Sequence, residues 1–295
     1  MVTVNRVLVG VDFSRDSDES LTGALHIAAL HDADVYAVHV IDNRPEDDLL
    51  NPAVEHQQTI QDALEARLKR VAENAKVSLD CSRLHAVLKT GRPTRELLRA
   101  TREIDPDVVI VGNRGKGLIQ RTLLGSVASS LVRRLERPLI VTRGWDQSDE
   151  RRVLAAVDLG DDSVRVIEVA ADWAQRIGAP LDVLYAWEIA GLSDSYSAIA
   201  GLPGRDVDRT AIHDARTRIE HLVEQVLGPD HDATLHVRAG LAVYEILGAV
   251  DRDTYGLVVM GSHGRRGLSK MLLGNTAEQV VQRAPCSVLV LRIGD

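Results

Sequence analysis

The stretch RVLVGVDFSRDSDESLTGALHIAALHDA, Arg6–Ala33, opens with an apolar run of strand length that ends at a carboxylate, Asp12. Beyond Asp12 the apolar residues recur at intervals of three and four, which predicts one buried face of a helix. They are Leu21, Ala24, Leu25, Ala28 and Ala29. The stretch therefore predicts a strand that leads directly into a helix.

The same alternation continues through the first half of the chain. Apolar runs of strand length are ADVYAVHVI, SRLHAVLK, DPDVVIVGN and RPLIVTR. Helical spacing is found between them, in the segment with Ile60, Leu64, Leu68 and Val71, in GRPTRELLRATREI and in SVASSLVRRLE. Strands that alternate with helices favour a parallel sheet covered on both faces. The low aromatic content of 3% also fits buried parallel strands built from Val, Leu, Ile and Ala.

The second half of the chain repeats the first. RVLVGVDFS at 6–14 returns as RVLAAVDLG at 152–160, and VIVGNRGKGLIQRTLLGS at 109–126 returns as VVMGSHGRRGLSKMLLGN at 258–275. Gly112, Gly115 and Gly125 of the second pair match Gly261, Gly264 and Gly274, and Gly91 matches Gly240, all at one constant offset. The 295 residues are also about twice the usual domain length of ~150. We expect two copies of one domain, 1–146 and 150–295, joined near TRGWDQSDERR.

Composition favours a soluble globular protein of the cytoplasm. The chain is 45% hydrophobic and 26% charged, and its formal net charge of −8 argues against a broad surface for nucleic acid or anionic membrane. Its two cysteines, Cys81 and Cys286, belong to no CxxC or Cys/His cluster, so no disulfide framework or zinc site is indicated. The first apolar run is too brief for a signal peptide, and no run approaches the ~18 residues that span a bilayer.

The glycine-rich segment VGNRGKGLIQRTLLGS, Val111–Ser126, carries the most specific signal. Glycine accepts positive φ and lets a ligand approach the main chain, so the segment is suited to presenting N–H groups to a phosphate. A Walker loop is excluded because Gly117 is followed by Leu118, and neither copy has GxGxxG after its first strand. The pattern present is G-x2-G-x9-G, followed by Ser126 or Asn275.

This pattern occurs twice, each time after a fourth strand and with an aspartate, Asp12 or Asp158, ending the first strand. In these features the chain resembles the ATP-binding members of the universal stress protein family, over nearly its whole length and as a tandem pair. The resemblance implies two Rossmann-like α/β domains, each with a five-stranded parallel sheet in the order 3-2-1-4-5. It also implies an intrachain pseudo-dimer through the last strands, RPLIVTR and CSVLVLR, and leaves open a homodimer of chains.

Ligands of such sheets bind beyond the carboxyl ends of the strands where the strand order reverses, here between strands one and four. The loop amides and the following helix start favour the phosphates of ATP, with or without Mg²⁺. Asp12 would repel phosphate, so we assign it to the ribose or adenine edge, and the resemblance puts adenine near Val40. The candidate residues are Val11, Asp12, Phe13, Ser14, Val40, Gly112, Arg114, Gly115, Gly117, Gly125, Ser126 and Val127 in the first copy, and Val157, Asp158, Leu159, Trp187, Gly261, His263, Gly264, Gly274, Asn275 and Thr276 in the second.

Several of these assignments have a purely structural alternative. Ser126 and Asn275 are strong N-cap residues, Asn275 with Glu278 matches a capping box, and Asp12 is also suited to capping the helix after the first strand. Trp187, matched here with Val40, either stacks on adenine or fills its pocket. The histidines outside the glycine-rich segments, among them His213, His221, His231 and His236, are not spaced like metal ligands.

A regulatory ATP-binding protein is the function that these patterns favour. No catalytic triad or metal-holding carboxylate pair is evident beside the loop, so we expect no enzymatic turnover beyond weak ATP hydrolysis. Nucleotide binding would order the loops for an unidentified protein partner. The alternatives are a slow ATPase or nucleotidyl-transfer enzyme and a nucleotide-free dimerisation scaffold. The first copy is expected to bind more tightly, because Ser126 is smaller than Asn275 and Glu278 brings negative charge to the second helix start.

Overall fold

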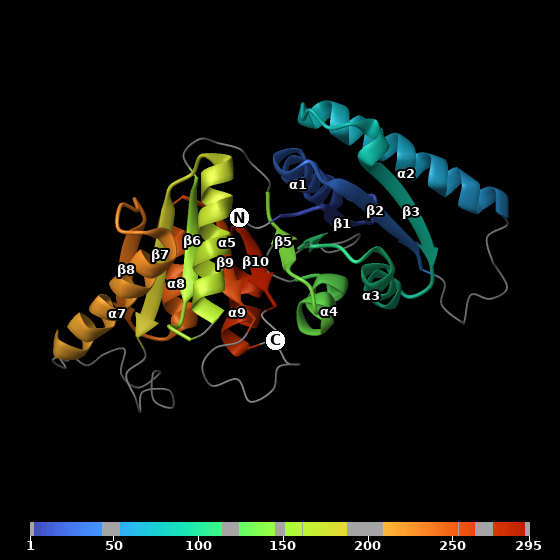
Figure 1. Ribbon diagram of the computed structural model, residues 1–295. Coiled ribbons are helices and arrows are strands. Elements are labelled where there is room, and N and C mark those ends of the chain that lie inside the picture. The colour runs from blue at the N-terminus through green and yellow to red at the C-terminus, as the bar shows by residue number, and fades with distance from the viewer. Residues whose placement is uncertain are drawn as a thin grey trace. The chain divides into compact units, whose positions relative to one another are not determined.

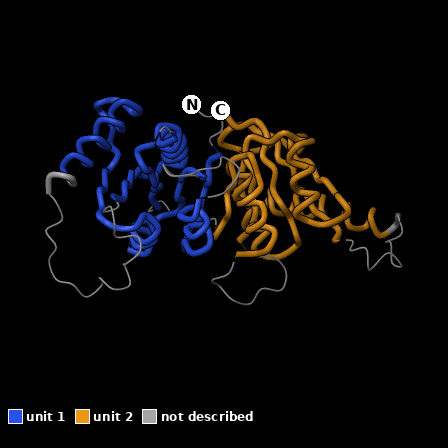
Figure 2. The backbone as a smooth tube through the Cα atoms, turned by 90° about the horizontal axis from the view of Figure 1, so that it is seen from below, with its two compact units in different colours: residues 1–2, 147–295 blue, residues 3–146 orange. Residues whose placement is uncertain are grey.

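The computed structural model describes residues 3–42, 54–113, 124–144, 151–160, 162–187, 209–252, 254–262 and 274–292. They belong to two compact units (Figure 2). The N-terminal unit comprises residues 3–146 and the C-terminal unit residues 147–295. Each unit is described by itself.

Strands and helices alternate through the N-terminal unit, as the periodicity predicts (Figure 1). The elements are β1 (Arg6–Val11), α1 (Arg15–His31), β2 (Asp34–Ile41), α2 (Val54–Ala75), the 3₁₀ turn η2 (Cys81–Arg83), β3 (Leu84–Thr90), α3 (Pro93–Ile104), β4 (Val108–Gly112), α4 (Ser126–Arg134) and β5 (Leu139–Thr142). The described strands pair in parallel in the order β3-β2-β1-β4-β5. The predicted fold and strand order are confirmed.

The C-terminal unit repeats this architecture. Its elements are β6 (Arg152–Val157), α5 (Asp162–Ile177), β7 (Leu181–Trp187), α7 (Arg209–Leu227), β8 (Thr234–Ala239), α8 (Ala242–Arg252), β9 (Tyr255–Gly261), α9 (Asn275–Arg283) and β10 (Ser287–Leu291). The described strands are again parallel, in the order β8-β7-β6-β9-β10. Both copies therefore share one topology.

Helices cover both faces of each sheet. In the N-terminal unit α1 and α2 pack together on one face, and α3 and α4 pack together on the other (Figure 1). The C-terminal unit pairs α5 with α7 and α8 with α9. The predicted apolar face of α1 is buried, with Leu21 and Leu25 fully covered, and each such leucine contributes about 1.5–3 kcal/mol of burial free energy. None of the helices in the described ranges is long and apolar enough to cross a membrane.

A repeated glycine follows the third strand of each unit. Gly91 has φ +141° and Gly240 has φ +158°, a region that side chains with a Cβ rarely adopt. A Cβ at Gly91 would lie 3.0 Å from Glu96 Cγ, and one at Gly240 would lie 2.6 Å from Glu245 Oε1. The Gly91 amide donates to the Ile41 carbonyl and the Gly240 amide to the Trp187 carbonyl. These two hydrogen bonds thus join the residue after the third strand to the last residue of the second strand in each unit.

Candidate functional site

The expected site lies where the first and fourth strands of each unit end. β1 and β4 run parallel, with Val9 opposite Ile110. β6 and β9 do the same, with Ala156 opposite Met260. Parallel neighbours end at the same edge of a sheet, so the aspartate after the first strand and the glycine-rich segment after the fourth leave from one edge.

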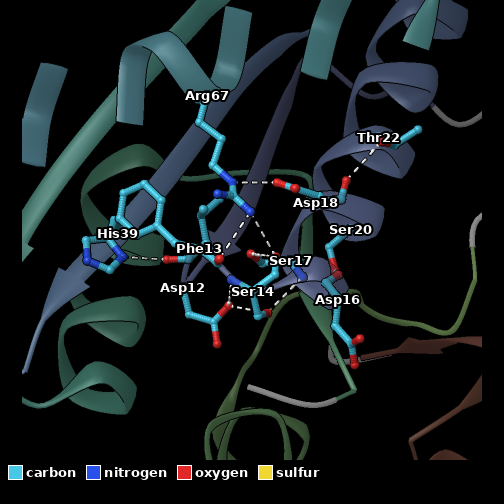
Figure 3. Close-up of polar contacts among 11 residues, drawn as sticks. Asp12, Phe13, Ser14, Asp16, Ser17, Asp18, Ser20, Thr22, His39 and Arg67 are labelled. Atoms are coloured by element: carbon cyan, nitrogen blue, oxygen red, sulfur yellow. Dashed lines mark hydrogen bonds and ion pairs between the residues drawn. The ribbon is translucent and has the colours of Figure 1, made fainter. Parts of the chain in front are cut away.

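The turn after β1 is built around the Asp12 carboxylate (Figure 3). Asp12 Oδ1 accepts hydrogen bonds from the Ser14 amide at 3.0 Å and from Ser14 Oγ at 2.5 Å. Phe13 between them has φ 62°, in the left-handed region. Ser14 Oγ accepts from the Ser17 amide at 3.2 Å and is the N-cap of α1. The alternative that Asp12 caps this helix is therefore wrong, because its carboxylate braces the turn one step earlier.

The C-terminal unit builds the same turn with different donors. Asp158 Oδ1 accepts from the Gly160 amide at 2.9 Å and from Ser163 Oγ at 3.1 Å. Leu159 between them has φ 61°. A non-glycine residue held in the left-handed region in both copies indicates a constraint on this turn, since such backbone strain concentrates at ligand-binding sites.

The two ends of each glycine-rich segment are tied together. The Gly125 amide donates to the Asn113 carbonyl at 2.7 Å, and the Gly274 amide donates to the Ser262 carbonyl at 2.7 Å. Asn113 and Ser262 are buried. The segment in each unit therefore leaves the fourth strand and returns to the next helix at one fixed point.

The helices that follow these segments begin at glycine caps. Gly125 caps α4 and Gly274 caps α9, because the first helical bonds already run from the Ser129 amide to the Gly125 carbonyl and from the Glu278 amide to the Gly274 carbonyl. The alternative that Ser126 and Asn275 serve as N-caps is therefore wrong. The predicted capping box is also wrong, because Asn275 Oδ1 accepts from Gln279 Nε2 at 3.0 Å.

Glycine caps leave these helix starts suited to an anion. Within the described residues neither cap makes a side-chain hydrogen bond, and glycine offers no acceptor of its own to the first-turn N–H groups. The positive end of the helix dipole lies at the same point. Ser126 and Asn275 are exposed, while Val127 and Thr276 are half-buried. This donor set fits the oxygens of a phosphate.

Some predicted site residues lie outside the described ranges. They are Arg114, Gly115, Gly117, His263 and Gly264. The structure brings together at the site edge, in the N-terminal unit, Val11, Asp12, Phe13, Ser14, Gly112, Gly125, Ser126 and Val127. In the C-terminal unit it does so for Val157, Asp158, Leu159, Gly261, Gly274, Asn275 and Thr276.

The ends of the second strands correct one match between the copies. Val11 pairs with His39 in the N-terminal unit, and Val157 pairs with Tyr185 in the C-terminal unit. Counting on from these pairs, Trp187 corresponds to Ile41, and Val40 corresponds to Ala186. The predicted match of Val40 with Trp187 is therefore wrong by one residue, which in a strand places the side chain on the opposite face.

Sequence reasoning missed two residues that hold the turn after β1, Arg67 and His39 (Figure 3). His39 Nδ1 donates to the Val11 carbonyl at 2.7 Å, and Arg67 Nη2 donates to the carbonyls of Phe13 and Ser14 at 3.1 Å each. The helix of Arg67 also carries Arg70, and no local pattern distinguishes the two arginines. Across the described ranges, no group of three or more His, Cys, Asp or Glu residues is arranged to hold a metal ion.

These features define a class: a tandem α/β protein whose two copies share one strand order and one arrangement of turns at the carboxyl ends of the first and fourth strands. The model of the Universal stress protein family matches residues 3–143 and again residues 150–292. The chain belongs to the universal stress protein family.

Relatives match along almost the whole chain. A universal stress protein of Mycolicibacterium smegmatis is 32% identical, with 97% of this chain and 96% of the relative covered. One of Mycobacterium tuberculosis is 29% identical over the same shares. The crystal structure of a universal stress protein from Archaeoglobus fulgidus has a TM-score of 0.70 at 21% identity, and the match covers 98% of this chain and 99% of that one. That structural likeness supports the tandem fold.

Proposed function

We propose that this protein is an ATP-binding regulator of the stress response that holds nucleotide at the site edge of one or both units. One observation carries the proposal. Each unit places a constrained aspartate turn and a glycine-capped helix start at the ends of two neighbouring parallel strands. A sugar hydroxyl suits the carboxylate, and a polyphosphate suits the helix start.

The residues take the following roles in this proposal. Asp12 and Asp158 accept hydrogen bonds from the ribose or the adenine edge. The main chain at the ends of β2 and β7 lies along the adenine. Backbone amides at the starts of α4 and α9 donate to phosphate oxygens, and bound ATP supplies there a charge that the helix dipoles stabilise. From the sequence, Arg114 and His263 add donors at the phosphates, with or without Mg²⁺.

The proposed role is a switch. A ligand that binds one arrangement of the loops better than the others shifts the population toward that arrangement. The loops around the site then present a surface to a protein partner. Chemical turnover forms no part of the proposal beyond weak ATP hydrolysis. The expected pairing of the two domains, the dimer of chains and the cytoplasmic location stay predictions; light scattering at high micromolar concentration tests the dimer, and cell fractionation tests the location.

The first experiment asks what the purified protein carries. The protein is denatured, and the released nucleotide is separated by chromatography. The stripped protein is then titrated with ATP in a calorimeter, beside Asp12→Ala/Asp158→Ala and the control Asp62→Ala, which changes an exposed aspartate of α2. ATP in the wild type and in the control, with binding lost in the double variant, supports the proposal.

The other outcomes point to the alternatives. ADP that accumulates with time in a sample supplied with ATP would favour the enzyme. A wild type that neither carries nor binds nucleotide would overturn the proposal and favour the scaffold. Equal binding by the double variant and the wild type would show that the nucleotide lies elsewhere.

A further inference from the structure

Arg67 of α2 reaches across to the turn that follows β1 (Figure 3). Its Nη2 donates to the carbonyls of Phe13 and Ser14, and its Nε lies 2.5 Å from Asp18 Oδ1 on α1. The Arg67 side chain is only 17% exposed. One planar guanidinium thus ties α2 to two successive carbonyls and to a carboxylate, a fork geometry that only arginine provides.

The Phe13 ring adds a second set of contacts. Arg67 Cζ lies 5.4 Å from the ring centroid, within range of a cation–π interaction. The ring also meets the His39 imidazole edge-on, with centroids 4.5 Å apart and planes at 62°. His39 in turn donates to the Val11 carbonyl. The segment from Val11 to Ser14 is therefore held from β2 and from α2 at once.

These contacts act on a strained backbone. The left-handed conformation of Phe13 is unfavourable for a residue with a Cβ, so it persists only where surrounding structure enforces it. The same conformation lets Asp12 Oδ1 reach the Ser14 amide and hydroxyl. Without Arg67 the backbone at Phe13 would still be strained, but the turn would lose the hydrogen bonds and the ring contact that hold it in this conformation.

The C-terminal unit lacks two of the side chains that make these contacts. The residue that matches Phe13 is Leu159, which has no ring for a guanidinium to cover. The residue that matches Asp18 is Val164, which has no carboxylate and is 40% exposed. Leu159 nonetheless has nearly the same φ, 61°. The two turns share a backbone conformation but not the side chains that hold it in the N-terminal unit.

We infer that Arg67 is a positioning residue of the N-terminal nucleotide site: it fixes the turn that presents Asp12, through a phenylalanine and an aspartate that the C-terminal turn does not have. The inference rests on the proposed function. A ligand that binds only one turn conformation has an apparent affinity reduced by the fraction of molecules in that conformation. Arg67 raises that fraction before nucleotide arrives.

The chain offers a direct probe of this turn, because Phe13 is its only phenylalanine. Protein labelled with ¹⁵N-phenylalanine gives a single backbone amide signal, which reports the turn alone. The variants are Arg67→Met, Arg67→Lys and the control Arg216→Met, which removes an exposed arginine of α7 paired with Glu220. We expect one sharp signal in the wild type and the control, and a broadened or split signal in Arg67→Met.

ATP titrations in an Asp158→Ala background then measure the N-terminal site. Arg67→Met is expected to bind about tenfold more weakly, which corresponds to about 1.4 kcal/mol, and saturating ATP is expected to restore its single Phe13 signal. Arg67→Lys keeps the charge but not the fork, so its loss should be smaller. Circular dichroism checks the fold. If Arg67→Met is unfolded, the comparison of Arg67→Lys with the wild type carries the test.

The other outcomes either overturn or support the positioning role of Arg67. Equal ATP affinity in the folded Arg67 variants and the wild type overturns the inference, whatever the Phe13 signal does, and leaves the proposed function standing. A wild type that binds no nucleotide overturns the proposed function and this inference with it. Weaker binding with a Phe13 signal that ATP sharpens supports both.

Discussion

Two well-covered charged residues, one in each unit, lie at opposite ends of the same fold. In the N-terminal unit Arg67 of α2 is well covered and holds the turn after β1, at the carboxyl ends of the strands. In the C-terminal unit the most deeply buried charged residue of the described ranges is Asp182, near the amino ends of the strands. The residue that matches Arg152 in the first unit, Arg6, is 41% exposed. The fold tolerates a buried ionic cluster at either end.

Asp182 is well supplied with hydrogen-bond donors. Its carboxylate accepts two hydrogen bonds from Arg152 and one from the Tyr255 hydroxyl at 2.5 Å, and His236 Nε2 lies 3.3 Å away. Burial alone would raise the Asp182 pKa, but the hydrogen bonds from Arg152 and Tyr255 outweigh it and lower the pKa. The hydrogen bond to Asp182 also raises the pKa of Arg152. The Asp182 cluster thus supports the amino ends of the strands in the C-terminal unit, whereas the Arg67 contacts support a turn at the carboxyl ends in the N-terminal unit.

The largest effect is expected from breaking the C-terminal cluster. Asp182→Ala leaves the Arg152 charge and the Tyr255 hydroxyl without their acceptor, and should lower the unfolding free energy by about 3 kcal/mol, the lower end for buried pairs because Arg152 is partly exposed. The control is Glu168→Ala, which removes an exposed pair with Arg165 and should cost less than about 1 kcal/mol. Urea denaturation measures both. Similar losses in the two variants would contradict a structural role for the cluster.

A carboxylate in a glycine-rich segment should remove nucleotide from one unit only. Gly115→Glu puts negative charge against phosphate oxygens and should weaken binding to the N-terminal unit at least tenfold, about 1.4 kcal/mol. Gly264→Glu should do the same to the C-terminal unit. Both positions lie outside the described residues, so this prediction rests on the sequence. Calorimetry measures the affinities and circular dichroism checks the fold; unchanged affinity in both variants would refute the phosphate-binding role.

The two sites should differ in affinity by about tenfold, or about 1.4 kcal/mol, with the N-terminal site tighter. Arg67 supports only the N-terminal turn, and Glu278 adds negative charge at the start of α9. Calorimetry on Asp158→Ala reports the N-terminal site, and calorimetry on Asp12→Ala reports the C-terminal site. Equal affinities, or a tighter C-terminal site, would reverse the ranking.

The smallest expected effect is on the pH dependence of stability, and it comes from the C-terminal unit alone. Because the folded-state pKa of Asp182 lies below the ordinary value of 3.8, its contribution to stability is fully present above that value and is lost as pH falls through the folded pKa. The stability gap between wild type and Asp182→Asn should therefore narrow below pH 3.8, by at most about 1.4 kcal/mol per pH unit. Denaturation curves at successive pH values test this, and a gap that stays constant down to the acid limit of folding would count against it.

Patterns that depend on burial were predictable from the sequence. The apolar spacing in α1 and α2 marked their buried faces, and Leu64 and Leu68 are indeed buried. The repeated glycines marked the two copies and the ends of the fourth strands. The strand order came from the family resemblance and not from the periodicity, which carries no information on which strands are neighbours.

Details set by long-range contacts were not predictable. Ser126 and Asn275 have strong cap propensities, but the bonds from Gly125 and Gly274 back to the fourth strands start each helix one residue earlier. Arg67 contacts carbonyls more than fifty residues away in the chain, and local spacing does not report such a contact. Val40 was matched with Trp187 because the sequence does not show where the second strand of each copy ends. That end is set by pairing with the neighbouring strands, and the pairing matches Trp187 with Ile41.

The bond between the Gly125 amide and the Asn113 carbonyl, and its counterpart between Gly274 and Ser262, joins the end of the fourth strand directly to the start of the next helix in each unit. A segment whose two ends are fixed at one point can change in sequence with little effect on the strand before it or the helix after it. After a gene duplication, one copy is then free to acquire a new ligand while the other keeps the old one. The same property makes residues 114–124 and 263–273 natural units for exchange between the copies in protein engineering.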